Sequence, residues 1–138
     1  MQETNEQAMQ EIYMKFQMMD KKIKNIQQQL EAVTQNLVEL TVTLNSLEDF
    51  SQADLKKEVL IPLNAGIYAK ANLRSNSELL VNVGANVVVE KDVPSTKKLI
   101  QGQIEEVRNV QNELLSELER LTSQAANLET QLQSMVGN

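Results

Sequence analysis

The residues that most often carry out chemistry in proteins are nearly absent from this chain of 138 residues. It contains no His, no Cys and no Trp, so neither a Ser-His-Asp nor a Cys-His nucleophile can be assembled. Zinc sites with nitrogen or sulfur ligands and redox thiols are excluded for the same reason. Carboxylates are abundant, but no P-loop and no GxGxxG motif accompanies them. We therefore expect a protein that is not an enzyme and that holds no cofactor or metal.

The side chains best suited to binding are methionines. Five of the six Met residues lie within the first 19 positions, together with Tyr13 and Phe16. Methionine is flexible and polarizable, so a methionine-rich surface suits the binding of many unrelated apolar segments. The sequence therefore favours interaction over catalysis.

The charge balance narrows the choice of partners. There are 13 basic and 19 acidic residues, which gives a net charge of −6. Binding to a phosphate backbone needs clustered basic side chains, and no long basic run is present, so nucleic acid is not an expected partner. No apolar run is long enough to span a bilayer, and the N-terminal MQETNEQAMQE is unlike a signal peptide. We expect no membrane partner and a cytoplasmic location.

The first 50 residues predict a coiled-coil helix that would carry the methionines. Apolar residues recur at steps of three and four without a slip, which is the spacing of a heptad seam. The row consists of Met9, Ile12, Phe16, Met19, Ile23, Ile26, Leu30, Val33, Leu37, Leu40, Leu44 and Leu47.

The C-terminal third repeats this pattern. Gln111 occupies one core position of the row, where a polar residue usually fixes the register at some cost in stability. Pro94 is tolerated in a first turn and Ser or Thr can cap a helix, so the helix is expected to begin between Val93 and Thr96. The apolar members of the row are Ile100, Ile104, Val107, Leu114, Leu118, Leu121, Ala125, Leu128, Leu132 and Met135.

The two rows most simply cover each other as an antiparallel pair, because they lie in one chain and a middle segment joins them. Parallel pairing of each row with another chain, as in a fibrous rod, stays open on the pattern alone. The expected organisation is a single structural unit. It has a coiled-coil helix over 1–50, a linker over 51–58, two β-hairpins for oligomerisation over 59–92 and a second coiled-coil helix over 93–138.

The middle segment changes to the period of a strand. Ile67, Ala69 and Ala71 alternate with polar or aromatic residues, and turn signals lie at 64–66 and 84–86. The pattern predicts four short strands in two hairpins, joined through a turn at 75–77. Such short strands bury little and leave exposed edges, so we expect strands from other subunits to complete the sheet.

The order helix, two hairpins, helix resembles the α class of the prefoldin family. VLIPLNAGIYAKANL at 59–73 resembles the family's first hairpin, and VNVGANVVVEKDV at 81–93 resembles its second. The chain departs from the family pattern at Asn64 and Asn86, where Gly is usual, and at Ile67, where a small polar residue is common. Asn tolerates a positive φ better than most residues, so the turns remain feasible.

The resemblance implies an α+β fold, mostly α: a long antiparallel coiled-coil helical hairpin whose two β-hairpins assemble into an intersubunit β-barrel. It further implies a hexamer of two α-class and four β-class subunits, which binds unfolded polypeptides at its coiled-coil tips and passes them to a group II chaperonin without ATP. The residues expected to serve oligomerisation are Leu60, Ile61, Leu63, Ile67, Leu73, Leu79, Val81, Val83, Val87 and Val89.

Both termini, and with them the methionines, are expected at the tip that lies away from the hairpins. Tyr13, Met14 and Met18 do not belong to the heptad row, so they should face water, where they would contact clients. A frayed tip or a contact with a further helix would also explain apolar residues at these positions. The expected client-binding residues are Met9, Ile12, Tyr13, Met14, Phe16, Met18, Met19, Leu128, Leu132, Met135 and Val136. A second function stays open: a structural or tethering coiled-coil protein that is multimerised through its β-hairpins.

Overall fold

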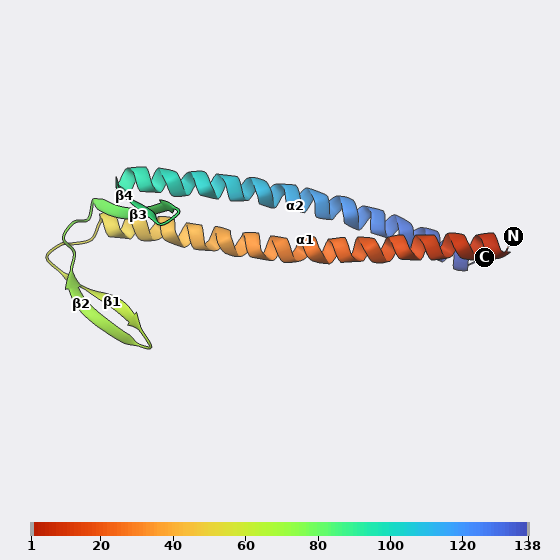
Figure 1. The fold of residues 1–138 in the computed structure, drawn as a ribbon, viewed down its shortest axis with the longest axis horizontal. Helices are drawn as coiled ribbons and strands as arrows, with labels where there is room; N and C mark the ends of the chain where they lie inside the picture. Colours follow the sequence, from red (N-terminus) through yellow and green to blue (C-terminus); the bar gives the residue numbers. More distant parts are fainter. Residues whose placement is uncertain (1, 138) are drawn as a thin grey trace. The chain divides into compact units, whose positions relative to one another are not determined.

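The structure, a computed structural model, describes residues 2–137 and the side-chain burial of residues 4–137. Along the chain, one long helix precedes two short hairpins and a second long helix follows them (Figure 1), so the predicted fold class is confirmed. The elements are α1 (Gln2–Ser51), β1 (Glu58–Asn64), β2 (Ile67–Asn72), β3 (Glu78–Gly84), β4 (Val87–Asp92) and α2 (Val93–Val136).

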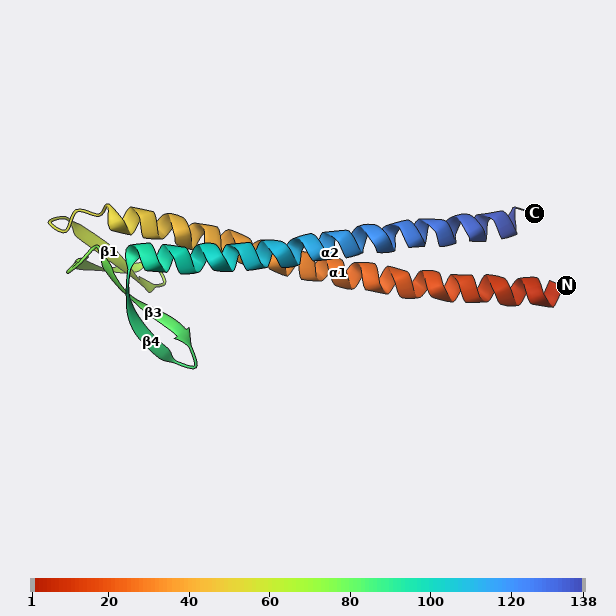
Figure 2. The same ribbon diagram turned by 90° about the horizontal axis from the view of Figure 1, so that it is seen from above.

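The chain divides into two compact units. One unit consists of Met1–Leu37 and Glu106–Asn138, and the other is Val38–Glu105. In the first unit, α1 and α2 run antiparallel, so the beginning of α1 and the end of α2 lie at the same end of the pair (Figure 1, Figure 2). The second unit holds the end of α1, the two hairpins and the start of α2.

The predicted heptad rows form the contact between α1 and α2. Every residue of both rows is buried or half-buried, and Leu121 is the most deeply buried at 1% exposure. By contrast, Tyr13, Met14 and Met18, which fall off the α1 row, are 54%, 63% and 60% exposed. The antiparallel pair within one chain is thus the observed arrangement, and the two heptad rows supply the apolar contact between its helices.

The start of α2 lies within the predicted range, but the predicted cap is wrong. The Oδ1 atom of Asp92 accepts a hydrogen bond from the backbone N–H of Ser95 at 2.8 Å, and the hydroxyl of Thr96 donates to the Asp92 carbonyl oxygen at 2.8 Å. Asp92, and not Ser or Thr, therefore caps the helix, because its carboxylate satisfies a free N–H at the positive end of the helix dipole. These bonds with Ser95 lower the pKa of Asp92.

The two hairpins form separate two-stranded antiparallel sheets with matching registers. Glu58 pairs with Asn72, and Glu78 pairs with Asp92. Each hairpin has a register shift just before its turn, and the residue that follows the shift is Asn64 in the first hairpin and Gly84 in the second. The second hairpin therefore repeats the first at a distance of 20 positions (78 − 58 = 20).

Both turns place two central residues at positive φ, as in a type I′ turn. The first turn has Ala65 at 52° and Gly66 at 77°, and the second has Ala85 at 51° and Asn86 at 61°. Asn64 also has a positive φ, of 99°. The expectation that Asn64 and Asn86 permit the turns is confirmed.

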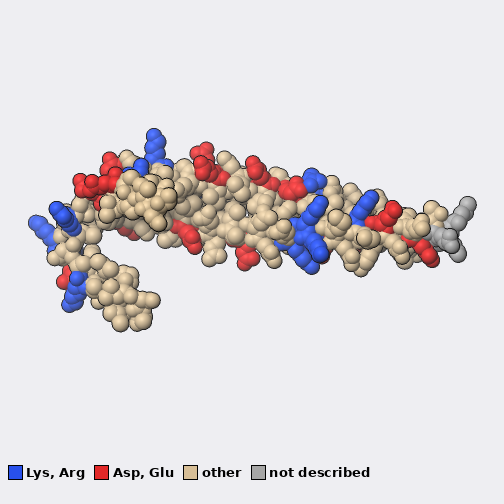
Figure 3. All heavy atoms as spheres, in the orientation of Figure 1, with Lys and Arg blue, Asp and Glu red and all other residues tan. Residues whose placement is uncertain are grey.

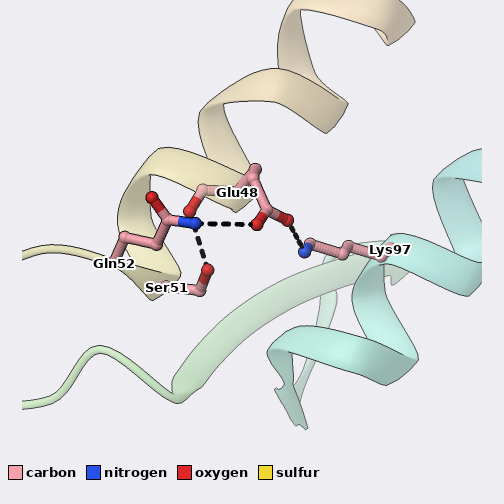
Figure 4. Close-up of polar contacts among 4 residues, drawn as sticks. All are labelled: Glu48, Ser51, Gln52 and Lys97. Carbon is pink, nitrogen blue, oxygen red and sulfur yellow. Dashed lines mark hydrogen bonds and ion pairs between the residues drawn. The ribbon is translucent and has the colours of Figure 1, made fainter.

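Side-chain contacts in the second unit connect the hairpins to the helix ends. Asn76, in the link between the hairpins, donates from Nδ2 to the carbonyl oxygens of Ala53 at 3.1 Å and Ser51 at 3.4 Å. Lys97 of α2 forms an ion pair with Glu48 of α1, which also accepts a hydrogen bond from Gln52 (Figure 4). The end of α1 is thus tied both to the hairpin link and to α2.

Candidate functional site

Three adjoining grooves lie on the helix pair of the first unit, where the sequence predicts client contact. Tyr13 is shared by two of the grooves and Met18 by two, so the three form one continuous surface. We call it the methionine-rich surface and define it by the lining residues given in the next three paragraphs.

The first groove lies between the helices nearest to the chain ends and has a volume of about 360 Å³. Tyr13 and Val136, which stand on opposite helices, are 54% and 70% exposed. The groove can therefore receive an apolar side chain from solvent. It is lined by Met9, Gln10, Tyr13, Leu132 and Val136.

The second groove is formed by α1 alone and has a volume of about 580 Å³. Its apolar part includes Met14, the most exposed methionine of the described chain at 63%. A contiguous patch of exposed apolar side chains usually marks a surface that a partner covers. The groove is lined by Tyr13, Met14, Phe16, Gln17, Met18, Asp20, Lys21 and Lys24.

The third groove again lies between the helices and has a volume of about 450 Å³. Its apolar residues are Met18 and Met19 from α1 and Leu128 from α2. The remaining lining residues are polar or charged: Lys15, Lys22, Gln124 and Asn127.

The structure brings most of the predicted client-binding residues together, in two layers. Tyr13, Met14, Met18 and Val136 are exposed. The half-buried residues Met9, Phe16, Met19, Leu128 and Leu132 line the same grooves, whereas Ile12 and Met135 are half-buried in the seam and line none of the three. Met1, the fifth methionine of the N-terminal group, lies outside the described residues.

Sequence reasoning missed the polar residues of the third groove. Lys15 and Lys22 are one heptad apart, which places them on the same side of α1 beside the seam. That spacing was the available signal. The two amides, Gln124 and Asn127, carried no such signal because α2 has many exposed amide side chains.

The predicted oligomerisation residues also fall into two groups. Leu60, Ile61, Leu63, Ile67, Val83 and Val87 are exposed, by 46% to 61%. Leu73, Leu79, Val81 and Val89 are half-buried, at positions toward the base of each hairpin. Each hairpin thus presents apolar side chains near its turn that remain exposed among the residues whose side chains the structure describes.

Three exposed hairpin residues are not among the predicted oligomerisation residues. Leu80 is 76% exposed, Tyr68 is 59% and Val88 is 54%. The signal was present in the sequence, since ELLV at 78–81 and VVV at 87–89 are apolar on both faces. Strands with two apolar faces are usually covered on both sides.

The acidic residues do not gather into a binding site of their own. Among residues 2–137 no cluster of three or more acidic side chains could hold a metal ion. Within the same range, neither helix contains an apolar stretch of the length that crossing a bilayer requires.

Comparison with known proteins agrees with the arrangement of the elements. Residues 19–137 match the family model for prefoldin, described as a prefoldin subunit. Prefoldin subunit alpha of Archaeoglobus fulgidus is 29% identical over 114 residues, which cover 78% of this chain and 83% of the relative. Prefoldin subunit alpha of Methanococcus vannielii is 26% identical, with 96% of each chain covered.

A solved structure, the cryo-EM structure of filamentous PFD from Methanocaldococcus jannaschii, has the same fold. It matches with a TM-score of 0.73 at 16% sequence identity, over 88% of this chain and 98% of that chain. The chain belongs to the prefoldin family, whose members are chaperone subunits and not enzymes. Both relatives named above are α subunits from archaea, which confirms the resemblance stated from the hairpin segments.

Proposed function

We propose that this prefoldin subunit works in an ATP-independent holdase and binds unfolded polypeptides on the methionine-rich surface. The observation that carries the proposal is the exposure of Tyr13, Met14 and Met18 on one continuous surface, at 54%, 63% and 60%. Unfolded chains present apolar side chains in no fixed order. Flexible thioethers adapt to such varied shapes, and the absence of His and Cys is no obstacle to this activity.

Weak contacts on one subunit suffice if several subunits act on the same client. Each shallow groove accepts only one or two apolar side chains, so we expect a single site to bind weakly. Linking several such sites in one assembly raises the overall affinity without any new contact. The assembly is therefore part of the proposed mechanism.

We assign the assembly to the hairpins, in a hexamer of two α-class and four β-class subunits. Each hairpin is an isolated two-stranded sheet, which is marginally stable in water. Its outer edges are unpaired within residues 2–137, and Leu80 is 76% exposed. Pairing with strands of other subunits into a β-barrel would satisfy these edges and cover the leucine. Delivery of clients to a group II chaperonin in the cytoplasm is proposed from the family resemblance alone.

The proposal is tested by suppression of aggregation. We expect the assembled protein to reduce light scattering by a chemically denatured client after dilution, in the absence of ATP. The variant Tyr13→Ser, Met14→Ser, Met18→Ser should lose most of this activity while it keeps its helix content. The matched control is Val110→Ser, Leu115→Ser, because these two residues of α2 are likewise exposed and apolar but line none of the three grooves.

Unchanged suppression by an intact assembly of the triple variant would contradict the assignment of clients to this surface. Native mass spectrometry with and without a β-class partner tests the composition. A mixed hexamer supports the proposed assembly. A homo-oligomer that does not suppress aggregation supports the alternative of a tethering coiled-coil protein.

A further inference from the structure

The groove around Met18 and Leu128 has an apolar floor beside two lysines. Met18 and Met19 of α1 and Leu128 of α2 supply the floor, and Met18 is 60% exposed, so a ligand can reach it. Lys15 and Lys22 line the α1 side of the same groove, whose volume is about 450 Å³. An apolar side chain and a charged group can therefore be bound next to each other.

The two lysines are available to a ligand. Neither Lys15 nor Lys22 takes part in an ion pair among residues 4–137. Glu117 is held by Arg120, whose Nε donates to it at 3.0 Å. That hydrogen bond is the main cause of the lowered pKa of Glu117, and the charge of Lys22 contributes least. Glu117 is thus already paired with Arg120, and Lys22 has no ion-pair partner among residues 4–137.

The opposite side of the groove is polar and uncharged. Gln124 and Asn127 of α2 carry amides, which can both donate hydrogen bonds to a peptide backbone and accept them from it. Lys15 and Lys22 are seven positions apart, so their backbones are separated by about 10.5 Å along α1. This distance corresponds to about three residues of an extended chain.

This groove lies in a basic stretch of an acidic protein. Residues 15–24 hold four lysines and one aspartate, whereas the whole chain has a net charge of −6. In Figure 3 the basic side chains gather over one stretch of the helix pair, while acidic ones are spread along it. A negatively charged segment is attracted to this stretch and repelled by most of the remaining surface.

We propose that this groove selects unfolded segments in which an apolar side chain is flanked on both sides by Asp or Glu. The apolar side chain lies over Met18 and Leu128, and the flanking carboxylates pair with Lys15 and Lys22. The inference rests on the proposed client binding and deepens it, because it names the chemistry of the preferred client. Segments with basic flanks place like charges against the lysines and bind more weakly.

The test uses fluorescence anisotropy with the full chain in its assembled form. Three fluorescein-labelled peptides share one apolar centre and carry flanks of Glu, Ser or Lys. We expect the Glu-flanked peptide to bind about fivefold more tightly than the Ser-flanked one at low salt, which is the effect of two exposed ion pairs. In about 1 M NaCl, where the Debye length falls to about 3 Å, the difference should largely disappear. The variant Lys15→Gln, Lys22→Gln should lose the preference and still bind the Ser-flanked peptide.

The control variant is Lys56→Gln, Lys57→Gln, which changes the net charge equally in the link between α1 and β1 and should keep the preference. Equal binding of the Glu- and Lys-flanked peptides by the unaltered chain would overturn the inference and leave the proposed function intact. Retention of the preference in the Lys15, Lys22 variant would overturn it as well. If none of the three peptides binds, both the inference and the proposed function fail.

Discussion

The Nε2 atom of Gln111 donates a hydrogen bond to the Oγ1 atom of Thr34 at 3.3 Å, across the two helices and 77 positions along the chain. Gln111 is half-buried and occupies a core position of the α2 row. Its amide therefore has a specific partner on α1 in one alignment of the helices. This agrees with the interpretation of Gln111 as a residue that fixes the register.

Replacement of Gln111 by Leu should raise the stability of the helix pair. An aliphatic side chain fits the seam, and the exposed hydroxyl of Thr34 can turn to water. We expect a gain of about 1 kcal/mol in the free energy of unfolding, since the added apolar area is partly buried. Thermal unfolding followed by circular dichroism measures it.

The companion variant Thr34→Ala removes only the hydrogen bond. It should lower the free energy of unfolding by about 1 kcal/mol or less. A lower melting temperature for Gln111→Leu than for the unaltered chain would contradict the interpretation that Gln111 fixes the register at a cost in stability.

The first turn should become more stable when Asn64 is replaced by Gly. Asn64 has a φ of 99°, which side chains rarely adopt, and the equivalent residue of the second hairpin is Gly84 at 120°. Removing the side chain should stabilise the chain by about 1 kcal/mol, although the bond from the Ala65 N–H to the Asn64 side chain is lost. Chemical denaturation measures the change.

The reciprocal variant is Gly84→Asn, which places a side chain in the same conformation. Nothing lies within 4 Å of an added Cβ atom there, so any loss reflects the backbone alone. A destabilisation by Asn64→Gly, or a neutral Gly84→Asn, would contradict the equivalence of the two turns.

Assembly should depend on Leu80, the most exposed large hydrophobic side chain of the described residues at 76%. Leu80→Asp should weaken association about tenfold or more, because burial of a leucine contributes at least about 1.5 kcal/mol and a charge opposes burial. Concentration-dependent native mass spectrometry measures the change. Leu115→Asp, on the exposed face of α2, introduces the same charge and should leave the assembly intact. If the two variants form assemblies of the same mass at every concentration, Leu80 is not part of the interface.

The capping carboxylate of Asp92 should make stability depend on pH. Its pKa is lowered in the folded chain by the hydrogen bonds with Ser95. The ionised form is therefore the one that stabilises the fold. This contribution is fully present above the unfolded pKa of about 3.9 and is lost as the pH falls through the lower folded value.

Asp92→Ala should accordingly lower the melting temperature more at pH 7 than at about pH 3, because the contribution of the carboxylate decreases once the pH is below the unfolded pKa. Glu129→Ala removes an exposed carboxylate of α2 without a cap and serves as the control. An Asp92→Ala deficit that stays the same at both pH values would assign the effect to backbone conformation instead of charge.

The helices were predictable residue by residue because the heptad period is a local property of the sequence. Ile26 and Leu47 on α1 and Ile104 on α2 are buried as the row requires. The positions of the hairpin turns were also predictable, since Gly and Asn tolerate positive φ, but the turn type was not, because Ala65 and Ala85 also adopt positive φ. The Asp92 cap was missed because Ser95 and Thr96 are also good capping residues, and only the backbone path shows that the helix begins directly after Asp92.

Contacts that depend on tertiary structure were beyond the sequence. Asn76 lies in a polar turn, and nothing local indicates that its amide reaches the carbonyl oxygens at the end of α1. Strand alternation likewise separates two faces but does not tell which of them a partner covers, so Leu80 and Tyr68 were left out of the predicted oligomerisation residues. The lysines of the third groove became part of a site only when Leu128 of α2 was placed beside them.

The ion pair between Glu48 and Lys97 has a consequence for the order of folding. It closes a loop of 49 positions, whereas the bond between Gln111 and Thr34 spans 77. Loop closure costs more entropy as the loop grows, so the helices should first meet beside the hairpins. Each further turn of α1 can then pack against α2 at little additional cost in loop-closure entropy. We therefore expect the methionine-rich surface, next to the chain ends, to form last and to open first when the helix pair frays.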